Sequence, residues 1–578
     1  MSLKYSNEKN VLLLLALLKA HGVRKVIASP GTTNITLVGS MMHDPFFQIY
    51  SAVDERSAAY IACGMAEESG EPVIICCTGA TASRNYFSGL TEAYYRKLPI
   101  LAITATREEC KVGHLIDQQI DRTLQPRDTV RCSEHLQIIK DDEDWWNCTI
   151  KINRVLLSLK SNGGGPAHLN FPTLYSKRFD VDKLPQVRKI ERYQLYDEFP
   201  EISYKRDVAI FIGSHKRMTV LEERQIERFC EFYNAVVFCD ITCGYHGKYG
   251  ITMSANKRPQ VDLLIHLGEV SCVAYGCKPN EVWRVSEDGE LRDTFRKLTK
   301  VFAMPDVEFF KRYTCKRSDI DISKYNEYKE YEDFIYSKLK EVPFSNGWIA
   351  QYLHDKLPMN SVVHLGIVSS FFAWNRFKLD PSINITCNQG GFGIDGNIST
   401  LMGQALIHPE KIYYCFIGDL AFFYDMNVLG NRHFPNNIRI LLVNNGKGVI
   451  FRKPTNIGSV FGEEADLFLA AGGHFGNMNH ELVKSLVTNL GFTYLSAKDK
   501  ESFMNNINSF ISPELLANPI VLECFVSTEN EIAGDNLLRE QGLKGIVNGL
   551  LGDDLYDGLK RIATNITKGN MGVDAGRN

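Results

Sequence analysis

The chain has 578 residues, with 65 Lys and Arg against 68 Asp and Glu, so its formal net charge at pH 7 is −3. This balance argues against nucleic-acid binding by bulk charge. With 44% hydrophobic and 23% charged residues, the composition excludes a disordered or collagen-like chain. The length corresponds to about three or four domains. We therefore expect a soluble, multi-domain protein.

Neither a membrane span nor a disulfide framework is predicted. The longest early apolar run, Val11 to Leu18, is too short to cross a membrane and lacks a small-residue cleavage site. None of the 15 cysteines forms a C-x-x-C pair, and Cys76 and Cys77 lie inside an apolar, strand-like run. A reduced, cytoplasmic protein is the expectation.

Helical and strand patterns alternate in the first 180 residues. Strands separated by helices of this length indicate right-handed βαβ units and a parallel sheet. We predict a first domain over 1–182, with helices over 10–21, 56–68 and 86–95 and strands over 26–28, 49–53, 72–77 and 100–104.

Two further blocks with alternating patterns follow, so the fold class is α/β. A charged, proline-containing linker is predicted over 182–204, a second linker with an entering helix over 311–346, and a flexible tail over 567–578. The central domain, 190–340, has predicted strands over 208–212, 235–239 and 263–267 and a helix over 220–233. The third, 345–566, has strands over 362–365, 413–417 and 438–443, a glycine-rich loop over 389–396 and a helix near Met426.

Polar residues follow two neighbouring strands of the third domain. Gly418-Asp419-Leu420 comes after one strand and Asn444-Asn445 after the next, with Asp419 and Asn445 26 residues apart. This spacing is about one βαβ unit, so both fall at the carboxyl edge of neighbouring parallel strands, where open α/β sheets bind ligands. A carboxylate, an amide oxygen and a nearby backbone carbonyl suit Mg²⁺ or Ca²⁺ that also holds a diphosphate. The structural alternative is a tight strand–turn–helix with a capping Asp.

The G-D-x segment closed by N-N resembles the diphosphate-binding motif of the thiamine-diphosphate-dependent enzymes. Ser29-Pro30-Gly31, Asp54-Glu55-Arg56 and Thr78-Gly79 resemble landmarks of that family's pyrimidine-binding domain. Gly393-Ile394-Asp395-Gly396 and the segment 418–425 are similar to those of the 2-succinyl-5-enolpyruvyl-6-hydroxy-3-cyclohexene-1-carboxylate synthases of menaquinone biosynthesis. That branch shares Leu420, where most of the superfamily has glycine.

The resemblance implies three doubly wound parallel-sheet domains: pyrimidine-binding, central and diphosphate-binding. It implies thiamine diphosphate and Mg²⁺ as cofactors, held at the interface of a homodimer or dimer of dimers, with no nucleic-acid or membrane partner. The implied metal ligands are Asp419, Asn445 and Lys447. The implied cofactor-binding residues are Ser29, Pro30, Gly31, Thr78, Gly79, Ile394, Gly418, Asp419, Leu420, Asn445 and Gly448.

Catalytic roles also come from this resemblance. Glu55 takes the position of the glutamate that hydrogen-bonds N1′ of the aminopyrimidine and favours the imino tautomer that takes the thiazolium C2 proton. Ile394 takes that of the apolar residue that props the cofactor in its V-shape, and Gln118 resembles an active-site glutamine. The alternatives are an exposed Glu in a helical first turn, an ordinary core Ile and a solvated polar loop.

The chain departs from the synthases at their carboxylate-binding arginines. Thr32 and Thr33 stand where that family has Ser-Arg, Gln389 replaces an arginine before the G-I-D-G loop, and another expected arginine falls near Phe371. Only Arg107 matches. Since arginines hold carboxylates bidentately, their loss predicts a different, less anionic acceptor, for instance an aldehyde or keto-sugar.

The resemblance therefore implies decarboxylation of a 2-oxo acid, followed by carboligation of the resulting enamine to an acceptor. A simple decarboxylase that releases an aldehyde is the alternative. A cofactor-free scaffold or sensor is a second alternative, although Glu55, Asp419 and Asn445 occur together. A flavin- or nucleotide-binding protein is a third, against which no G-x-G-x-x-G follows a strand in 190–340.

Overall fold

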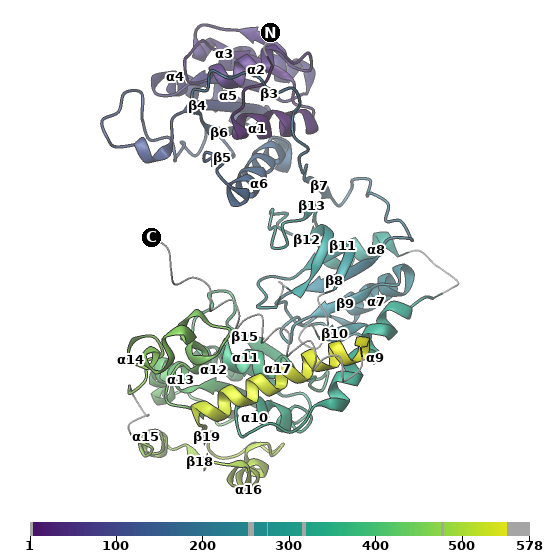
Figure 1. Cartoon of the computed structure of the whole chain (residues 1–578), viewed down its shortest axis with the longest axis vertical. Helices are drawn as coiled ribbons and strands as arrows, with labels where there is room; N and C mark the ends of the chain where they lie inside the picture. Colours follow the sequence, from purple (N-terminus) through teal and green to yellow (C-terminus); the bar gives the residue numbers. More distant parts are fainter. Residues whose placement is uncertain (1–3, 253–258, 274–275, 315–319, 475–478, 552–578) are drawn as a thin grey trace, which may run out of the picture. The chain divides into compact units, whose positions relative to one another are not determined.

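A computed structural model of the chain describes residues 4–252, 259–273, 276–314, 320–474 and 479–551 (Figure 1). The predicted tail over 567–578 lies outside the described residues. The chain divides into two compact units: Met1–Phe199 with Asp288–Ala303, and Pro200–Glu287 with Met304–Asn578. The structure contains three sheets of parallel strands with interleaved helices, which confirms the predicted α/β class.

The first sheet belongs to the first unit and has six parallel strands. Their order is β2 (Gln48–Ser51), β1 (Lys25–Ala28), β3 (Val73–Thr78), β4 (Ile100–Thr106), β6 (Ala167–Pro172) and β5 (Cys132–His135). Alternate strand residues point to opposite faces. One face packs against α1 (Lys9–Ala20) and α6 (Asp142–Ser158), and the other against α3 (Glu55–Ser69) and α5 (Phe87–Arg96). The sheet is therefore doubly wound.

Helix α3 carries the predicted catalytic glutamate at its first position. The carboxylate of Asp54 accepts a hydrogen bond from Arg56 N at 3.2 Å and so caps the helix, and Gly70 ends it in the left-handed conformation at φ 66°. The helix therefore begins at Glu55, one residue before the predicted start, and the preceding strand ends at Ser51 rather than at residue 53.

The second unit contains a further sheet of parallel strands. These run β10 (Gly250–Thr252), β9 (Val236–Cys239), β8 (Val208–Ile212), β11 (Gln260–Leu267) and β12 (Lys278–Val285). Two strands from the same region of the sequence, β13 (Leu298–Ala303) and β7 (Glu191–Gln194), pair in parallel within the first unit. The helices of this region are α7 (Val220–Tyr233), α8 (Asp306–Tyr313) and α9 (Ser323–Lys338).

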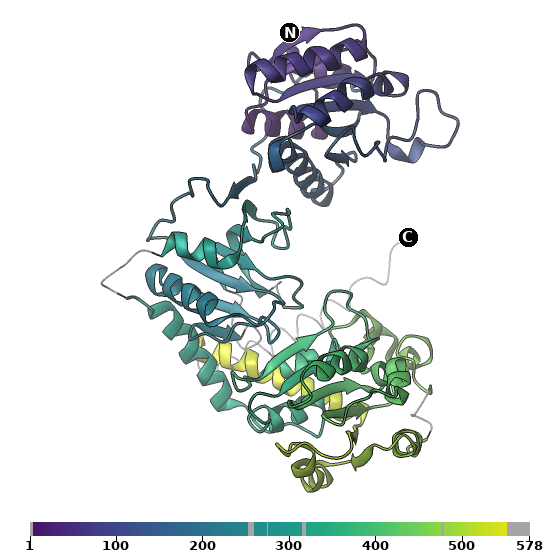
Figure 2. The same ribbon diagram turned by 180° about the vertical axis from the view of Figure 1, so that it is seen from behind.

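The predicted linkers contain regular structure. Strand β7 lies inside the stretch 182–204 because pairing with β13 holds a charged segment that has no strand pattern of its own. Helix α9 occupies much of 311–346 and contacts α17 (Thr528–Leu551) and β10. Figure 2 shows α9 and the yellow α17 side by side. Tertiary packing thus orders segments whose composition is typical of linkers.

The third sheet also has six parallel strands. Their order is β15 (Asn384–Cys387), β14 (Val362–Leu365), β16 (Tyr413–Gly418), β17 (Ile438–Asn444), β19 (Ile520–Phe525) and β18 (Thr493–Ala497). One face packs against α10 (Asn346–Leu353), α11 (Ser369–Trp374), α16 (Lys500–Phe510) and α17. The other packs against α12 (Asn397–Ile407), α13 (Asp419–Asp425) and α15 (Leu482–Asn489). The helix predicted near Met426 is α13, continued by a 3₁₀ turn over Met426–Gly430.

Two general features bear on the setting of the protein. Among the described helices, none is both long enough and apolar enough to cross a membrane. The fourteen cysteines in the described part of the chain are free thiols.

Candidate active site

The predicted site residues of the second unit follow the strands of the third sheet at one edge. Asp419 begins α13 directly after β16, and Asn445 follows β17, which pairs with β16 in parallel. Gln389 and Ile394 come after β15, on the other side of β14. The carboxyl ends of parallel strands form one edge, so the predicted neighbourhood of Asp419 and Asn445 is confirmed.

The carboxylate of Asp419 is buried and bound by backbone N–H groups. Its residue is 3% exposed. Oδ1 accepts a hydrogen bond from Leu420 N at 2.7 Å, and Oδ2 accepts from Asn445 N at 3.1 Å and Gly446 N at 2.6 Å. Burial outweighs these bonds and raises the pKa of Asp419 to about 6. In the cation-free protein this shift costs the ionised form about 3 kcal/mol.

The side chain of Asn445 supplies a second oxygen. Its Oδ1 is buried and has no hydrogen-bond partner within the described residues. A buried amide oxygen without a donor is unfavourable, and a cation would satisfy it. Together with the buried carboxylate of Asp419 and the carbonyl of Lys447, it forms a hard-oxygen set that fits a divalent cation such as Mg²⁺. The residues present therefore fit the implied metal.

Cation binding at this edge is expected to strengthen as the pH rises from about 5 to about 7. The Asp419 carboxyl must lose its proton to bind a cation, so below its pKa the apparent affinity falls about tenfold per pH unit. Without a cation, folding stability falls as the pH rises from about 4 to about 6, because the native state binds this proton more tightly than the unfolded chain. Calorimetric titration with MgCl₂ and thiamine diphosphate across this range checks the first effect, and an affinity independent of pH would contradict it.

Two cationic side chains of the following loop are paired with the same acid. Asp466 accepts from Lys447 Nζ at 2.5 Å and lies 2.9 Å from Arg452 Nη1. These two cations hold the pKa of Asp466 below its usual range, although partial burial opposes them. The Lys447 side chain is therefore paired; its backbone oxygen accepts from Val449 N at 3.0 Å and would bind a metal through its second lone pair.

Strand β17 is tied to β19 behind the metal ligands. Glu523 is 1% exposed, and it accepts hydrogen bonds from Asn444 Nδ2 at 2.7 Å and Tyr494 OH at 2.8 Å. Burial raises the pKa of Glu523. This acid fixes the first residue of the Asn-Asn pair and so positions Asn445.

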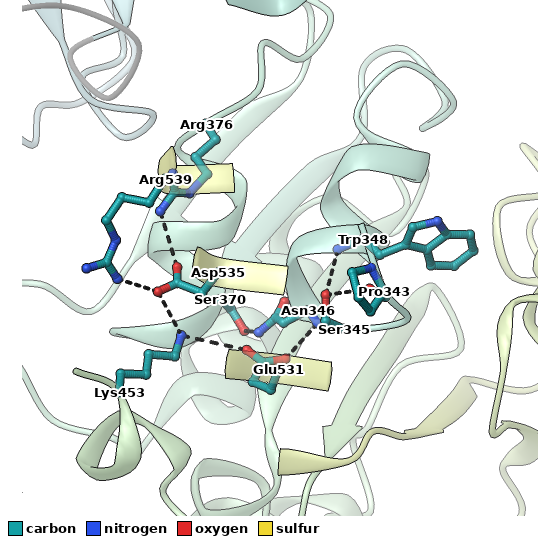
Figure 3. A network of polar contacts seen from close by, with 10 residues as sticks. All are labelled: Pro343, Ser345, Asn346, Trp348, Ser370, Arg376, Lys453, Glu531, Asp535 and Arg539. Atoms are coloured by element: carbon teal, nitrogen blue, oxygen red, sulfur yellow. Dashed lines mark hydrogen bonds and ion pairs between the residues drawn. The ribbon is translucent and has the colours of Figure 1, made fainter. Parts of the chain in front are cut away.

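The loop is anchored at its far end by a buried polar network (Figure 3). Lys453 Nζ lies 3.8 Å from both Glu531 Oε1 and Asp535 Oδ2 of α17. Glu531 Oε2 accepts from Asn346 N at 2.8 Å, and Asp535 Oδ1 accepts from Arg376 Nη2 at 3.2 Å. Because buried charges are stable only when they are paired, these contacts fix the end of the metal-site loop against α17, and α17 against α10.

Ile394 is held by the residue that starts the next helix. Asn397, fully buried at the start of α12, donates through Nδ2 to the Ile394 carbonyl at 2.7 Å. The Ile394 side chain is partly buried against the apolar cluster of this face. A Cβ added at Gly418 would meet no atom within 4 Å, so there is open space at the backbone beside Asp419. Leu420 is partly buried, and Gly448 packs closely on Phe451.

The predicted residues of the first unit also collect at one edge of a sheet. Ser29 follows β1, Glu55 begins the helix after β2, Thr78 ends β3 and Arg107 follows β4, and these strands are neighbours in the sheet. Glu55 is partly buried, and its Oε2 accepts a hydrogen bond from Asn85 Nδ2 at 3.0 Å.

The loops after β1 and β3 pack tightly on each other. A Cβ at Gly31 would lie 2.6 Å from Thr78 Cβ, so only glycine fits there. Thr33 is buried; its hydroxyl contacts that of Thr78 and donates to the Ala105 carbonyl at 2.9 Å. Ser29 is also buried, whereas Pro30 and Thr32 are exposed. Of the two threonines predicted to meet substrate, Thr32 is thus the accessible one.

Arg107 and Gln118 lie on the loops that follow β4. Arg107 donates through Nε to Tyr175 OH at 3.0 Å, and its Nη1 lies 3.2 Å from Asp117 Oδ1. Gln118 is exposed and adopts a left-handed conformation at φ 59°. The guanidinium is therefore already oriented by a neighbour of Gln118, and Asp117 would have to release it for a substrate carboxylate.

Two predicted substrate residues lie inside the second unit. Gln389 is 1% exposed; its Nε2 donates to Thr242 Oγ1 at 2.6 Å, and its Oε1 accepts from Cys272 Sγ at 3.5 Å. The glutamine thus joins the central and third domains in place of binding a carboxylate. Phe371 is fully buried in α11, so its ring has no face open to a substrate in this chain.

Three supporting residues were missed by sequence reasoning. Asp466 and Glu523 lie in segments with no motif, far along the chain from the groups they hold. Asn397 offered the only signal, since it directly follows the Gly-Ile-Asp-Gly segment.

These features define a class of protein: an α/β protein with polar residues at the carboxyl edges of two parallel sheets, one of which fits a divalent cation. The family described as "Thiamine pyrophosphate enzyme, N-terminal TPP binding domain" matches residues 11–125. Proteins named 2-succinyl-5-enolpyruvyl-6-hydroxy-3-cyclohexene-1-carboxylate synthase are similar over nearly their whole length. The one from Bacteroides fragilis is 32% identical, covering 91% of this chain and 98% of its own, and the one from Bacteroides thetaiotaomicron is 31% identical, covering 92% and 98%.

The chain therefore belongs to the family of thiamine-diphosphate-dependent enzymes that contains these synthases. Among solved structures, the thiamine diphosphate-dependent 4-hydroxybenzoylformate decarboxylase of Rhodococcus jostii RHA1 is 14% identical. It covers 90% of this chain and 99% of its own with a TM-score of 0.39, a similarity too distant to bear on the site.

Proposed function

We propose that this protein decarboxylates a 2-oxo acid with thiamine diphosphate and Mg²⁺ and then joins the remaining fragment to an acceptor. The observation that carries the proposal is a pair of buried groups at the edge of the third sheet: the Asp419 carboxylate with its raised pKa and the Asn445 Oδ1, which has no hydrogen-bond partner among the described residues. A cation would satisfy both, and a diphosphate is the natural counter-ligand of such a cation. When bound, thiamine diphosphate supplies the electron sink for decarboxylation.

The residues of this chain have distinct roles in the proposal. Asp419, Asn445 and the Lys447 carbonyl hold Mg²⁺, and Ile394 supports the cofactor from its apolar side. Glu55 accepts and returns one proton at the aminopyrimidine N1′. Its hydrogen bond from Asn85 orients the carboxylate without supplying a charge.

We propose a homodimer, which the distribution of these residues supports. Glu55 lies in the first unit, whereas Asp419 and Asn445 lie in the second, and each set occupies an edge of its own sheet. Helix α3 exposes Tyr60 at 48% and Ile61 at 46%, which suits burial against a second copy. We propose that each cofactor lies between the first domain of one subunit and the third domain of its partner. With only free thiols among the described cysteines, a reducing, cytoplasmic setting is part of the proposal.

The reaction is tested by CO₂ release from a panel of 2-oxo acids with thiamine diphosphate and Mg²⁺. We expect one acid to be turned over, and the Glu55→Gln variant to release CO₂ from it at least about a hundredfold more slowly. Mass spectrometry of the products separates carboligation from simple decarboxylation, because the latter leaves a free aldehyde. Cofactor binding without turnover of any acid, with or without added acceptors, would contradict the proposal.

The acceptor is proposed to be less anionic than that of the synthases. Gln389 and Phe371 replace two arginines and are buried, and Arg107 is paired with Asp117. Aldehydes or keto-sugars should therefore be better acceptors than dicarboxylates in competition. A dicarboxylic acceptor that outcompetes them would refute this part of the proposal.

A further inference from the structure

Arg122 is a buried cation that lacks a counter-ion. It lies in the first unit between β4 and β5 and is 3% exposed. Its backbone carbonyl is fixed by Gln125 Nε2 at 2.9 Å and His135 Nε2 at 3.1 Å. The guanidinium Nε and Nη1 are buried without a hydrogen-bond partner in the part of the chain that the structure describes. Buried charges are otherwise paired, so this arrangement requires an explanation.

The groups that face Arg122 do not compensate its charge. It lines a small cavity together with Arg84, a second cation, whose Nη2 donates to the Asp121 carbonyl at 2.9 Å. His168 also lines it, but both ring nitrogens are bonded, to Thr104 Oγ1 at 2.7 Å and to Ser133 Oγ at 2.9 Å. Burial and the nearby arginines lower the pKa of His168 to about 3, so the ring is neutral. No carboxylate is found among the described lining residues.

Loss of a proton does not remove the unpaired charge of Arg122. Burial lowers the pKa of Arg122 to about 10, which leaves the guanidinium charged at neutral pH. The buried Arg122 and the exposed Arg84 therefore line one partly open cavity to which the described lining residues contribute no negative charge. An anion in that space would neutralise the charge and accept hydrogen bonds from the free N–H groups of Arg122.

The size of the cavity decides which anion fits. The space available to the centre of a water-sized sphere is about 10 Å³, close to what one ordered water needs. Phosphate and sulfate exceed it. We propose that this cavity binds one halide-sized monovalent anion, such as chloride, between Arg122 and Arg84. The site lies within the first unit, and its test does not depend on the proposed reaction.

The anion site is coupled to the loop after β3. A Cβ at Gly79 would lie 2.6 Å from Arg122 Nη1, so the guanidinium packs directly against this glycine. The next residue, Ala80, has φ 56° and ψ −132°, a conformation that a non-glycine residue adopts at a cost. A bound anion holds Arg122 beneath this loop and thereby helps to fix it.

Thermal unfolding of the full-length protein in sodium chloride, bromide or gluconate at equal ionic strength tests the site. We expect the midpoint to rise and saturate with chloride and bromide, by about 5 °C at a hundredfold excess over Kd, and to stay constant in gluconate, which is too large to enter. Arg122→Met should abolish the halide effect, and Arg127→Met, a change at an exposed arginine of the same segment, should retain it. In gluconate, Arg122→Met should be at least as stable as the wild type, because it removes an uncompensated charge.

A second readout can already be made on the wild-type protein. The wild-type protein should broaden the ³⁵Cl NMR line. The broadening should behave as a saturable site, and bromide should remove it by competing with chloride. Gly79→Ala, which displaces the guanidinium, should weaken the broadening. The proposal would be overturned by equal unfolding midpoints in chloride and gluconate, or by a halide effect that persists in Arg122→Met. It would also be overturned if formate, but not bromide, removed the line broadening.

Discussion

Asp419→Ala is expected to abolish the Mg²⁺-dependent binding of thiamine diphosphate, with an affinity loss of at least about a hundredfold. Changing a residue that only supports a metal ligand typically lowers metal affinity or activity 10- to 100-fold, and Asp419 is proposed to bind the cation directly. Calorimetric titration of the cofactor in saturating Mg²⁺ measures the loss. Glu410→Ala, which removes an exposed carboxylate before β16 at the opposite edge of the sheet, is the matched control and should bind normally.

Asn445→Ala separates loss of the cation from loss of the fold. Because Asn445 Oδ1 makes no hydrogen bond within the described residues, its removal should change the stability of the cation-free protein by less than about 0.5 kcal/mol. The same variant should lose Mg²⁺-dependent cofactor binding. Normal cofactor affinity in both Asp419→Ala and Asn445→Ala would refute the metal site.

The sequence predicted this edge of the sheet well because its signal is local. A short motif ends each of two strands, and a spacing of one βαβ unit places both motifs at neighbouring strands, as β16 and β17 show. The protonation of Asp419 and the ion pairing of Lys447 were not predictable in the same way. The pKa of Asp419 depends on how completely the chain buries it, and the pairing of Lys447 depends on Asp466 in a segment without a motif.

The predicted substrate residues show where roles transferred from the motifs of relatives fail. A position that corresponds to an arginine in relatives need not face the same space, and Gln389 shows this: its amide bonds Thr242 and Cys272 of the central domain. Thr33 likewise turns inward to Thr78. Side-chain direction at such positions is set by long-range packing, which a single sequence does not display. Arg122 belongs to no motif. Only the structure shows that its guanidinium is buried, with Nε and Nη1 unpaired among the described residues.

Glu55→Gln is expected to bind thiamine diphosphate within about tenfold of the wild type and to lose turnover by about 10²- to 10⁴-fold. The amide oxygen of glutamine can still accept the hydrogen bond from Asn85, so the start of α3 should be unchanged. What is lost is the group that exchanges a proton with the aminopyrimidine. Glu68→Gln, an exposed change near the other end of α3, controls for the substitution and should keep full activity. Full activity in Glu55→Gln would refute the assigned role.

The same two variants test whether one site is built from two subunits. In a mixed dimer of Glu55→Gln and Asp419→Ala subunits, one site contains both changes. The other combines an intact Glu55 with an intact Asp419 from the partner subunit. If subunits exchange freely, half of the dimers in an equal mixture are mixed, so about a quarter of the wild-type activity should return from two inactive proteins. If both halves of each site come from one chain, every site carries a change and mixing restores nothing. Recovered activity would therefore establish both the dimer and the pairing of Glu55 with Asp419 across it.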